Sequence, residues 1–309
     1  MNSNRKRRGI VVSSPQSRFG DKVFFCSEGR RHWIMDAAWL PENGFRWPED
    51  VIQVPPEVLE AFRPAGHAPR RWLTPLSSSS RAQSPIELRE RLVTGLYGSG
   101  IEIGAGANPM PLPLPCQVRF VDFFDRDGLL EHAYDGQHEG DLVTPDVIGT
   151  FEDLSGILDE SLDFVVACHV IEHTRDPIGA IAGAYRKLKP GGTIALVIPD
   201  MTRTFDRDRE LTPLNHLLED YRDPSRQRDI AHFEEFFAVA QPVPQPDYER
   251  VWRQNWEDAY PIHYHTWTYE SFSEMIQWIR DNVANFSSVW QHPAVDHEHC
   301  IEFYFSMKK

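Results

Sequence analysis

Two glycines and an acidic residue, each close behind a short apolar run, are the residues of this chain best suited to binding a small ligand. Residues 100–109 read Gly-Ile-Glu-Ile-Gly-Ala-Gly-Ala-Asn-Pro, so an apolar strand leads into a turn through Gly104 and Gly106. A second apolar run, residues 118–121, ends at Asp122. Glycines let a backbone turn tightly and approach a ligand, and a carboxylate here can accept hydrogen bonds from ribose hydroxyls. This spacing predicts a nucleoside-binding α/β domain.

The prolines that follow the turn narrow the choice of nucleoside. A dinucleotide fingerprint has a third glycine and opens a helix whose N-terminus holds a pyrophosphate, whereas here that glycine is replaced by Pro109. Prolines recur at positions 111, 113 and 115. Because proline lacks an N–H and clashes with the preceding turn, we expect residues 109–115 to be extended, near polyproline II. A nucleoside with an amino-acid tail, such as S-adenosylmethionine, fits this loop better than one with a pyrophosphate.

The elements that must position these residues alternate along the chain from about residue 86. This alternation predicts an α/β fold, a doubly wound and mainly parallel seven-stranded sheet. Strands are predicted over residues 101–103, 118–121, 147–148, 162–168 and 193–198, and helices over 86–96, from Pro177 to Leu188 and after Thr268. Two final strands, 286–290 and 301–305, are joined by too few residues for a helical crossover, so the last strand should pair antiparallel.

The rest of the chain divides into four predicted regions. Residues 1–22 are polar and read as a disordered tail, and residues 67–85 as a linker. Residues 23–66 are predicted to form a small β-rich module, either an independent unit or a cap packed on the main domain. Its aromatic pattern is similar to small modules that accompany bacterial cell-surface carbohydrate proteins. The main domain covers 86–309, with a lid insertion at 200–267.

Composition restricts the partners of the chain. Its 309 residues are 41% hydrophobic and 25% charged, with a formal net charge of −14. This balance indicates a globular protein and disfavours nucleic acid or an anionic membrane as partner. No run reaches the ~20 apolar residues of a membrane helix, and no apolar run follows the basic residues 5–8 as in a secretory signal. Four cysteines without paired spacing favour reduced thiols and a cytoplasmic location: Cys26, Cys116, Cys168 and Cys300.

Five motifs in order resemble the class I S-adenosylmethionine-dependent methyltransferases, and most closely their type 11 subgroup. They are Glu-Ile-Gly-Ala-Gly from 102, Asp122, Phe-Glu-Asp-Leu from 151, His-Val-Ile-Glu-His from 169 and Leu-Lys-Pro-Gly-Gly from 188. The resemblance implies S-adenosylmethionine as cofactor. It implies that Asp122 holds the ribose, that Asp153 and Leu154 lie at the adenine, and that His169 faces the cofactor. The remaining cofactor-binding residues that it implies are Glu102, Gly104, Ala105, Gly106 and Asn108.

Histidines supply the candidates for chemistry at the acceptor. His169, Glu172 and His173 have i, i+3, i+4 spacing, which shares one face if the segment is helical. They could ligate a divalent metal, as a similar motif with an acidic first residue does in ubiquinone-biosynthesis O-methyltransferases. Alternatively, His173 points into the acceptor pocket as a base, or the segment is purely structural. His263 and His265 lie two residues apart in a strand-like segment, so they share a face, and one of them could be the base.

Aromatic residues, histidines and arginines alternate in the lid insertion, as in Thr204 to Arg209 and His263 to Trp267. Such a composition suits a polar ring-shaped acceptor, but it also describes an ordinary amphipathic lid. The sequence therefore predicts in-line methyl transfer to an oxygen of a sugar, a glycan or another small polar acceptor. The alternatives are a protein or lipid-like acceptor, or a non-catalytic domain that keeps the fold for binding or assembly. The oligomeric state is not predicted.

Overall fold

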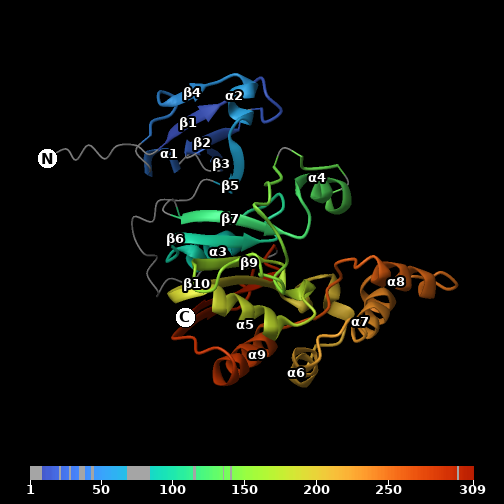
Figure 1. Ribbon diagram of the computed structural model, residues 1–309. Helices are drawn as coiled ribbons and strands as arrows, with labels where there is room; N and C mark the ends of the chain where they lie inside the picture. The colour runs from blue at the N-terminus through green and yellow to red at the C-terminus, as the bar shows by residue number, and fades with distance from the viewer. Residues whose placement is uncertain are drawn as a thin grey trace.

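The computed structural model describes residues 9–20, 22–27, 29–34, 39–42, 45–67, 84–113, 116–134, 136–139, 141–297 and 299–309. These residues form two β-sheets with helices, and Figure 1 shows the N-terminal sheet beside the β7 side of the larger one. Residues 1–8 and 21 of the predicted tail (1–22) and residues 68–83 of the predicted linker (67–85) lie outside the described residues. Among those described, no helix combines the length and the apolar character needed to cross a bilayer.

The N-terminal sheet has five strands in the order β4-β1-β2-β3-β5. Their bounds are β1 Ile10–Ser13, β2 Val23–Ser27, β3 Arg30–Ile34, β4 Val51–Gln53 and β5 Arg63–His67, with short helices α1 Trp39–Glu42 and α2 Pro56–Glu60. Strand β1 pairs antiparallel with β2 and parallel with β4. Phe25, Trp39 and Phe45 form the centre of its apolar core. The sheet includes residues 10–13, which the sequence placed in a disordered tail, because the short Ile-Val-Val run gains two strand partners.

The larger sheet has seven strands in the order β11-β12-β10-β9-β6-β7-β8. Their bounds are β6 Gly98–Ile103, β7 Cys116–Asp122, β8 Val147–Ile148, β9 Leu162–Cys168, β10 Leu188–Pro199, β11 Ser288–His292 and β12 Glu302–Lys308. Strands β6 to β10 run parallel, whereas β12 pairs antiparallel with both β10 and β11. The predicted fold class, a doubly wound and mainly parallel seven-stranded sheet with an antiparallel last strand, is confirmed.

Helices cover both faces of this sheet, and the alternation of side chains along β9 shows how. Phe164 and Val166 pack in one core with α3 (Pro85–Val93). Val165 and Ala167 face the opposite core, with α5 (Pro177–Lys187) and α9 (Tyr269–Asn282). Successive strand residues point to opposite faces, so a strand covered on both sides is apolar throughout. Asp176 caps α5 and Thr268 caps α9, as their sequences predict.

The insertion between β10 and α9 contributes a helical arm, which Figure 1 shows reaching past the ends of the strands. It contains α6 (Leu214–Arg222), α7 (Asp229–Glu235) and α8 (Tyr248–Glu257). The arm has an apolar core of its own, including Phe233, Trp252 and Tyr264. The segment 263–267, predicted to be strand-like, is extended but pairs with no strand among the described residues. It bridges the arm and the sheet domain, since the N–H of Tyr264 donates to the carbonyl of Glu172.

The N-terminal sheet contacts the larger sheet near β7. Arg30 donates a 2.6 Å hydrogen bond to the carbonyl of Val118 and lies over the ring of Phe120. Arg63 lies 3.6 Å from the carboxylate of Asp146. These contacts attach the N-terminal sheet to the sheet domain, while the boundaries at 23–66 and 86–309 stay predictions.

Candidate cofactor and acceptor site

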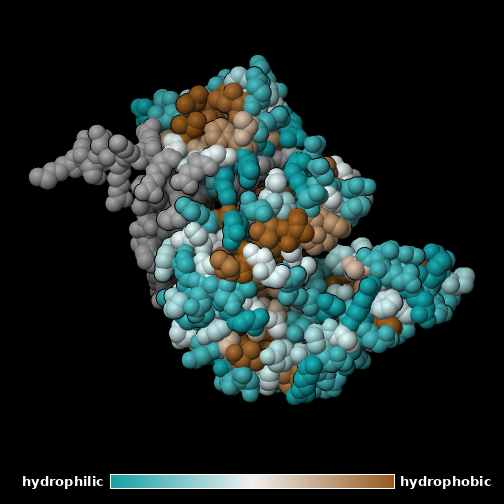
Figure 2. All heavy atoms as spheres, viewed as in Figure 1, coloured by the Kyte–Doolittle hydropathy of each residue, from teal (hydrophilic) through white to brown (hydrophobic). Residues whose placement is uncertain are grey.

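One cavity of about 690 Å³ lies beyond the carboxyl ends of β6, β7 and β9. Figure 2 shows the hollow between the α4 segment (α4, Arg126–Gly128) and the helical arm, with hydrophobic atoms exposed in it. We call its strand-end side the sheet wall, formed by Gly104, Gly106, Asp122, Phe151 and His169. We call its opposite side the lid wall, formed by Arg226, Asp229, Phe233, Trp256 and Tyr264. His173, Thr174 and Arg175 line the cavity between the two walls.

The glycine turn has a backbone that only glycine adopts readily. Gly104 and Gly106 have φ angles of +66° and +50°. A Cβ on Gly106 would lie 1.9 Å from the Oη of Tyr134, and one on Gly104 would lie 2.6 Å from a methyl of Val170. No helix follows over residues 107–113. The turn therefore leaves an open cradle without a helix N-terminus, which fits a nucleoside that lacks a pyrophosphate.

Glu102 lies beneath the turn and does not line the cavity. Its Oε1 accepts a 2.7 Å hydrogen bond from the N–H of Met110, and its Oε2 has no partner among the described residues. Burial raises the pKa of this carboxyl to about 8. Ala105 and Asn108 also lie outside the cavity lining. The cofactor contacts implied for these three residues therefore stay predictions.

The ribose and adenine candidates lie on neighbouring strand ends. Asp122 ends β7 and lines the cavity, and burial raises its pKa to about 6. In the Phe-Glu-Asp-Leu motif, Phe151 and Glu152 line the cavity. Asp153 instead accepts a hydrogen bond from the N–H of Ser155, and Leu154 is buried in the core. Adenine contacts from Asp153 and Leu154 stay predictions. The two preceding residues, Phe151 and Glu152, are the ones that line the cavity.

His169 follows β9 in a strained conformation, with φ of +53°. Such strain in a residue other than glycine is typical of functional sites. Its Nε2 lies 2.8 Å from Oε2 of Glu302, which also binds Arg89 through two 2.7 Å hydrogen bonds. Burial lowers the pKa of His169, but the bond to Glu302 and the nearby carboxylate of Glu172 outweigh burial and raise it overall. Arg89 and Glu302 could not be recognised from the sequence, because both are distant from His169 along the chain.

Glu172 is a buried carboxylate surrounded by histidines. It is 1% exposed, and neither of its oxygens has a hydrogen-bond partner among the described residues. Its Oε1 lies 3.7 Å from Nδ1 of His169 and 4.0 Å from Nε2 of His263. Ligand atoms of Glu172, His173 and His263 lie within 4.8 Å of one another. A divalent metal could be held there. His263 would then take the ligand position that was predicted for His169.

Of the three predicted base candidates, His173 is the one that lines the cavity. Its Nδ1 lies 2.9 Å from the carbonyl of Ile262, so Nδ1–H donates and Nε2 keeps its lone pair. Burial and the neighbouring His263 lower the pKa of His173. His263 lies behind it, with Nδ1 2.6 Å from Asp206. His265 is fully buried beside α6 and α7, where burial lowers its pKa to about 3. Their predicted roles as bases stay predictions.

The lid wall combines aromatic rings with both signs of charge. Arg226 lies over the ring of Trp256 and donates hydrogen bonds to the carbonyls of Trp256 and Glu257. Asp229 lies 3.8 Å from Arg175, and burial raises the pKa of Asp229 to about 6. The sequence indicated a lid here but not these particular residues, because their contacts join segments far apart in the chain.

Comparison with known proteins identifies the sheet domain. A family model described as "Methyltransferase domain" matches residues 101–196. Among curated protein sequences, none matches the chain significantly. The sheet order and motif order agree with the class I methyltransferase fold.

Three solved structures illustrate the fold likeness. An S-adenosylmethionine-dependent methyltransferase from Thermotoga maritima is 20% identical, with 69% of this chain and 82% of that one covered and a TM-score of 0.36. One from Methanococcus maripaludis is 18% identical, with 73% and 84% covered and a TM-score of 0.36. The CurJ carbon methyltransferase is 14% identical, with 72% and 51% covered and a TM-score of 0.37. Such low values carry none of their activities to this chain. The family match places a methyltransferase domain at residues 101–196 of the chain.

Proposed function

We propose that the enzyme methylates a hydroxyl group of a small polar ring-shaped acceptor, such as a sugar or a glycan end, bound against the lid wall. The observation that carries this proposal is the continuity of the cavity: residues of the family domain and of the lid insertion line the same 690 Å³ space. A donor on the sheet wall and an acceptor on the lid wall would therefore meet inside one cavity.

The sheet wall has the features that S-adenosylmethionine requires. The open cradle at Gly104 and Gly106 would accept its amino-acid tail, and Asp122 would accept hydrogen bonds from its ribose hydroxyls. Phe151 and Glu152 would border the adenine. When bound, this cofactor supplies a methyl group already activated on a sulfonium. The protein then has to align the acceptor oxygen, exclude water and remove one proton.

The lid wall suits a hydroxylated ring. Trp256, Phe233 and Tyr264 offer aromatic faces on which the C–H face of a sugar can stack. Asp229 and Arg226 offer an acceptor and donors for hydroxyl groups. A carboxylate and a guanidinium beside aromatic rings favour a neutral polar acceptor over a lipid chain, which offers neither group a hydrogen bond.

His173 is the proposed base. Its lowered pKa keeps the ring neutral near pH 7, and Nδ1–H is engaged by the carbonyl of Ile262. This leaves the lone pair of Nε2 to accept the proton of the acceptor hydroxyl. Glu172 behind the ring would stabilise the imidazolium that forms, because it is a buried carboxylate without another hydrogen-bond donor among the described residues.

An acceptor screen with labelled S-adenosylmethionine tests the proposal. Free sugars, nucleotide sugars, oligosaccharides, small amines, peptides and lipid-like alcohols are offered in parallel, and the methylated atom is identified in the product. The proposal expects an O-methylated carbohydrate. Label transferred to nitrogen or carbon, or to a peptide or lipid in place of a carbohydrate, would overturn it. Calorimetric binding of S-adenosylhomocysteine to the same preparation shows that a negative screen does not come from a damaged cofactor site.

A further inference from the structure

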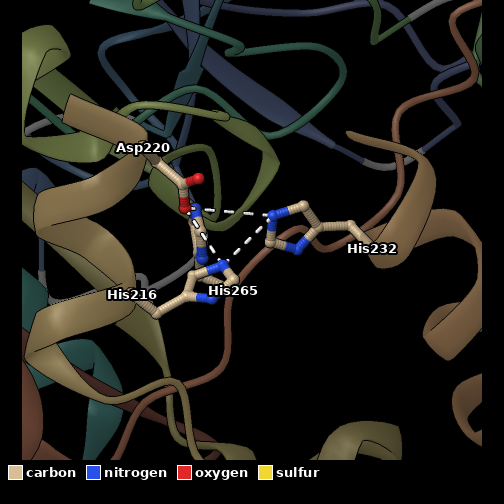
Figure 3. A group of neighbouring side chains, drawn as sticks. All are labelled: His216, Asp220, His232 and His265. Atoms are coloured by element: carbon tan, nitrogen blue, oxygen red, sulfur yellow. Dashed lines mark hydrogen bonds and ion pairs between the residues drawn. The ribbon is translucent and has the colours of Figure 1, made fainter. Parts of the chain in front are cut away.

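A second group of histidines lies in the helical arm, outside the cavity lining. His216 and Asp220 lie one turn apart on α6, His232 lies on α7, and His265 lies in the extended segment after α8. Figure 3 shows the four side chains turned toward one another. We propose that these four residues, here called the lid cluster, bind one divalent transition metal, with zinc as the best fit. The cluster lies wholly outside the family match at 101–196.

The spacing of the ligand atoms suits a tetrahedral metal. One ligand atom from each residue lies within 4.8 Å of all the others. Oδ2 of Asp220 lies 3.1 Å from Nε2 of His216 and 3.9 Å from Nε2 of His232, and Nδ1 of His265 is the ring nitrogen left free to bind a metal. The Nε2 atoms of His216 and His232 are 3.3 Å apart. With metal–ligand bonds of about 2.0–2.1 Å, neighbouring ligands of a tetrahedral zinc are about 3.3 Å apart. The cluster therefore needs only small shifts to surround an ion.

Two buried atoms of the lid cluster lack hydrogen-bond partners. Asp220 is 4% exposed and His265 is 1% exposed. Among the described residues, neither Oδ2 of Asp220 nor Nδ1 of His265 makes a well-aligned hydrogen bond. A buried polar atom without a partner destabilises the fold, because it has lost its hydrogen bonds to water. An ion at the centre would satisfy the carboxylate and the imidazoles together.

The surroundings of the lid cluster have the form found around metal ligands. Oδ1 of Asp220 accepts a 2.8 Å hydrogen bond from Nε of Arg228, which leaves Oδ2 facing the histidines. Nε2 of His265 lies 3.0 Å from the carbonyl of Arg175. Metal-binding histidines and carboxylates are usually oriented by such outer hydrogen bonds.

The chemistry of the donors favours zinc. Three imidazoles and one carboxylate give four nitrogen and oxygen ligands, a set typical of zinc, whereas magnesium and calcium prefer oxygen ligands alone. Four protein ligands without an open position are typical of a structural site. The ion would fasten α6, α7 and the extended segment to one another. Phe233 and Tyr264 each adjoin a ligand in sequence and line the cavity, so the ion would fix the lid wall whatever the acceptor is.

Metal analysis of the wild-type protein and its variants tests this proposal. Protein stripped with a chelator is titrated with zinc in a calorimeter, then desalted and assayed for metal. We expect one zinc per chain in the wild type, and at least about 10-fold weaker binding in H216A and D220N. His216 is the most exposed ligand, with 34% of its side chain accessible, so H216A should still fold. Unchanged binding of S-adenosylhomocysteine and a native circular dichroism spectrum check this.

The matched control distinguishes the lid cluster from the other histidine group. The double variant E172Q/H263A removes the group beside His173 and should keep one zinc with wild-type affinity. Cobalt should give the intense visible absorption of tetrahedral coordination in the wild type and not in H216A. The proposal is overturned if the wild type binds no zinc, if H216A and D220N bind it as the wild type does, or if only E172Q/H263A loses it.

Discussion

The sheet wall and the lid wall enclose one cavity, but different forces hold them. Behind the sheet wall, parallel strands and a continuous apolar core fix the positions of Gly104, Asp122 and His169. The lid wall is formed by short helices and the segments between them. Ion pairs, a small aromatic core and the lid cluster hold these elements together. A wall held by a sheet suits the cofactor, which is the ligand that related enzymes share. A wall assembled from polar contacts in an insertion can differ between enzymes, so it suits the acceptor.

The largest expected effect is on kcat and comes from His173, which lies between the two walls. H173A removes the proposed base, and general-base catalysis contributes about 10²- to 10⁴-fold, so kcat should fall by that range. Binding of S-adenosylhomocysteine should stay close to wild type, because the cradle is elsewhere. Steady-state kinetics and calorimetry measure the two quantities. H292A, at a partly exposed position in β11 away from the cavity lining, is the control. Turnover of H173A at the wild-type rate would exclude a catalytic role for His173.

One methyl group added to the sheet wall should weaken the binding of S-adenosylhomocysteine. G106A places a Cβ at φ +50° against Tyr134, and strain of about 1–3 kcal/mol corresponds to roughly 5- to 150-fold weaker S-adenosylhomocysteine binding. The matched control is G183A in α5, where a Cβ meets nothing closer than 3.8 Å. Calorimetry of both variants gives the comparison. Equal affinities in G106A and G183A would show that the cradle does not hold the cofactor.

The lid wall should affect the acceptor alone. W256A removes an aromatic face that lies under Arg226, and the loss of about 0.5–1.5 kcal/mol of stacking should raise the acceptor KM by roughly 2- to 12-fold. The affinity for S-adenosylhomocysteine should not change. Initial rates at varied acceptor and saturating donor give the KM. An unchanged KM would place the acceptor away from Trp256.

The smallest expected effect is a pH dependence of S-adenosylhomocysteine binding that distinguishes the two walls. The carboxyls of Asp122 and Asp229 both have a pKa raised by burial to about 6, one on each wall. Above that pH each is ionised and accepts hydrogen bonds, and below it each becomes protonated. Lowering the pH from about 7.5 to about 5 should therefore weaken S-adenosylhomocysteine binding roughly 3- to 10-fold, the value of one hydrogen bond. D122N should abolish this dependence and D229N should keep it. Retention of the dependence in D122N would assign it to another group.

The sheet wall was predictable because its signals are local. Gly104 and Gly106 directly follow β6, Asp122 ends β7, and His169 follows β9. Each position therefore depends on a neighbouring strand that the local sequence predicts. Parallel strands then bring these ends to one edge of the sheet. The same locality explains the correct capping residues of α5 and α9.

The lid wall and the lid cluster could not be predicted because their contacts are not local. His263 and His265 read as neighbours on one strand face, yet His263 contacts Asp206 and His265 contacts Arg175. The start of α6 has no local side-chain cap: Pro213 precedes the helix, and the hydroxyl of Thr212 accepts a hydrogen bond from the N–H of Thr266. Asp229 likewise begins α7 without capping it. Only the i, i+4 pair of His216 and Asp220 carried a local sign of the lid cluster.

A parallel calorimetric titration of the wild type, G106A and W256A with S-adenosylhomocysteine tests the separation of the two walls most directly. We expect one site per chain in the wild type, the same affinity in W256A, and binding weaker by about 5- to 150-fold in G106A. Weakening in W256A as large as that in G106A would contradict the account, since the cofactor would then rest on the lid wall.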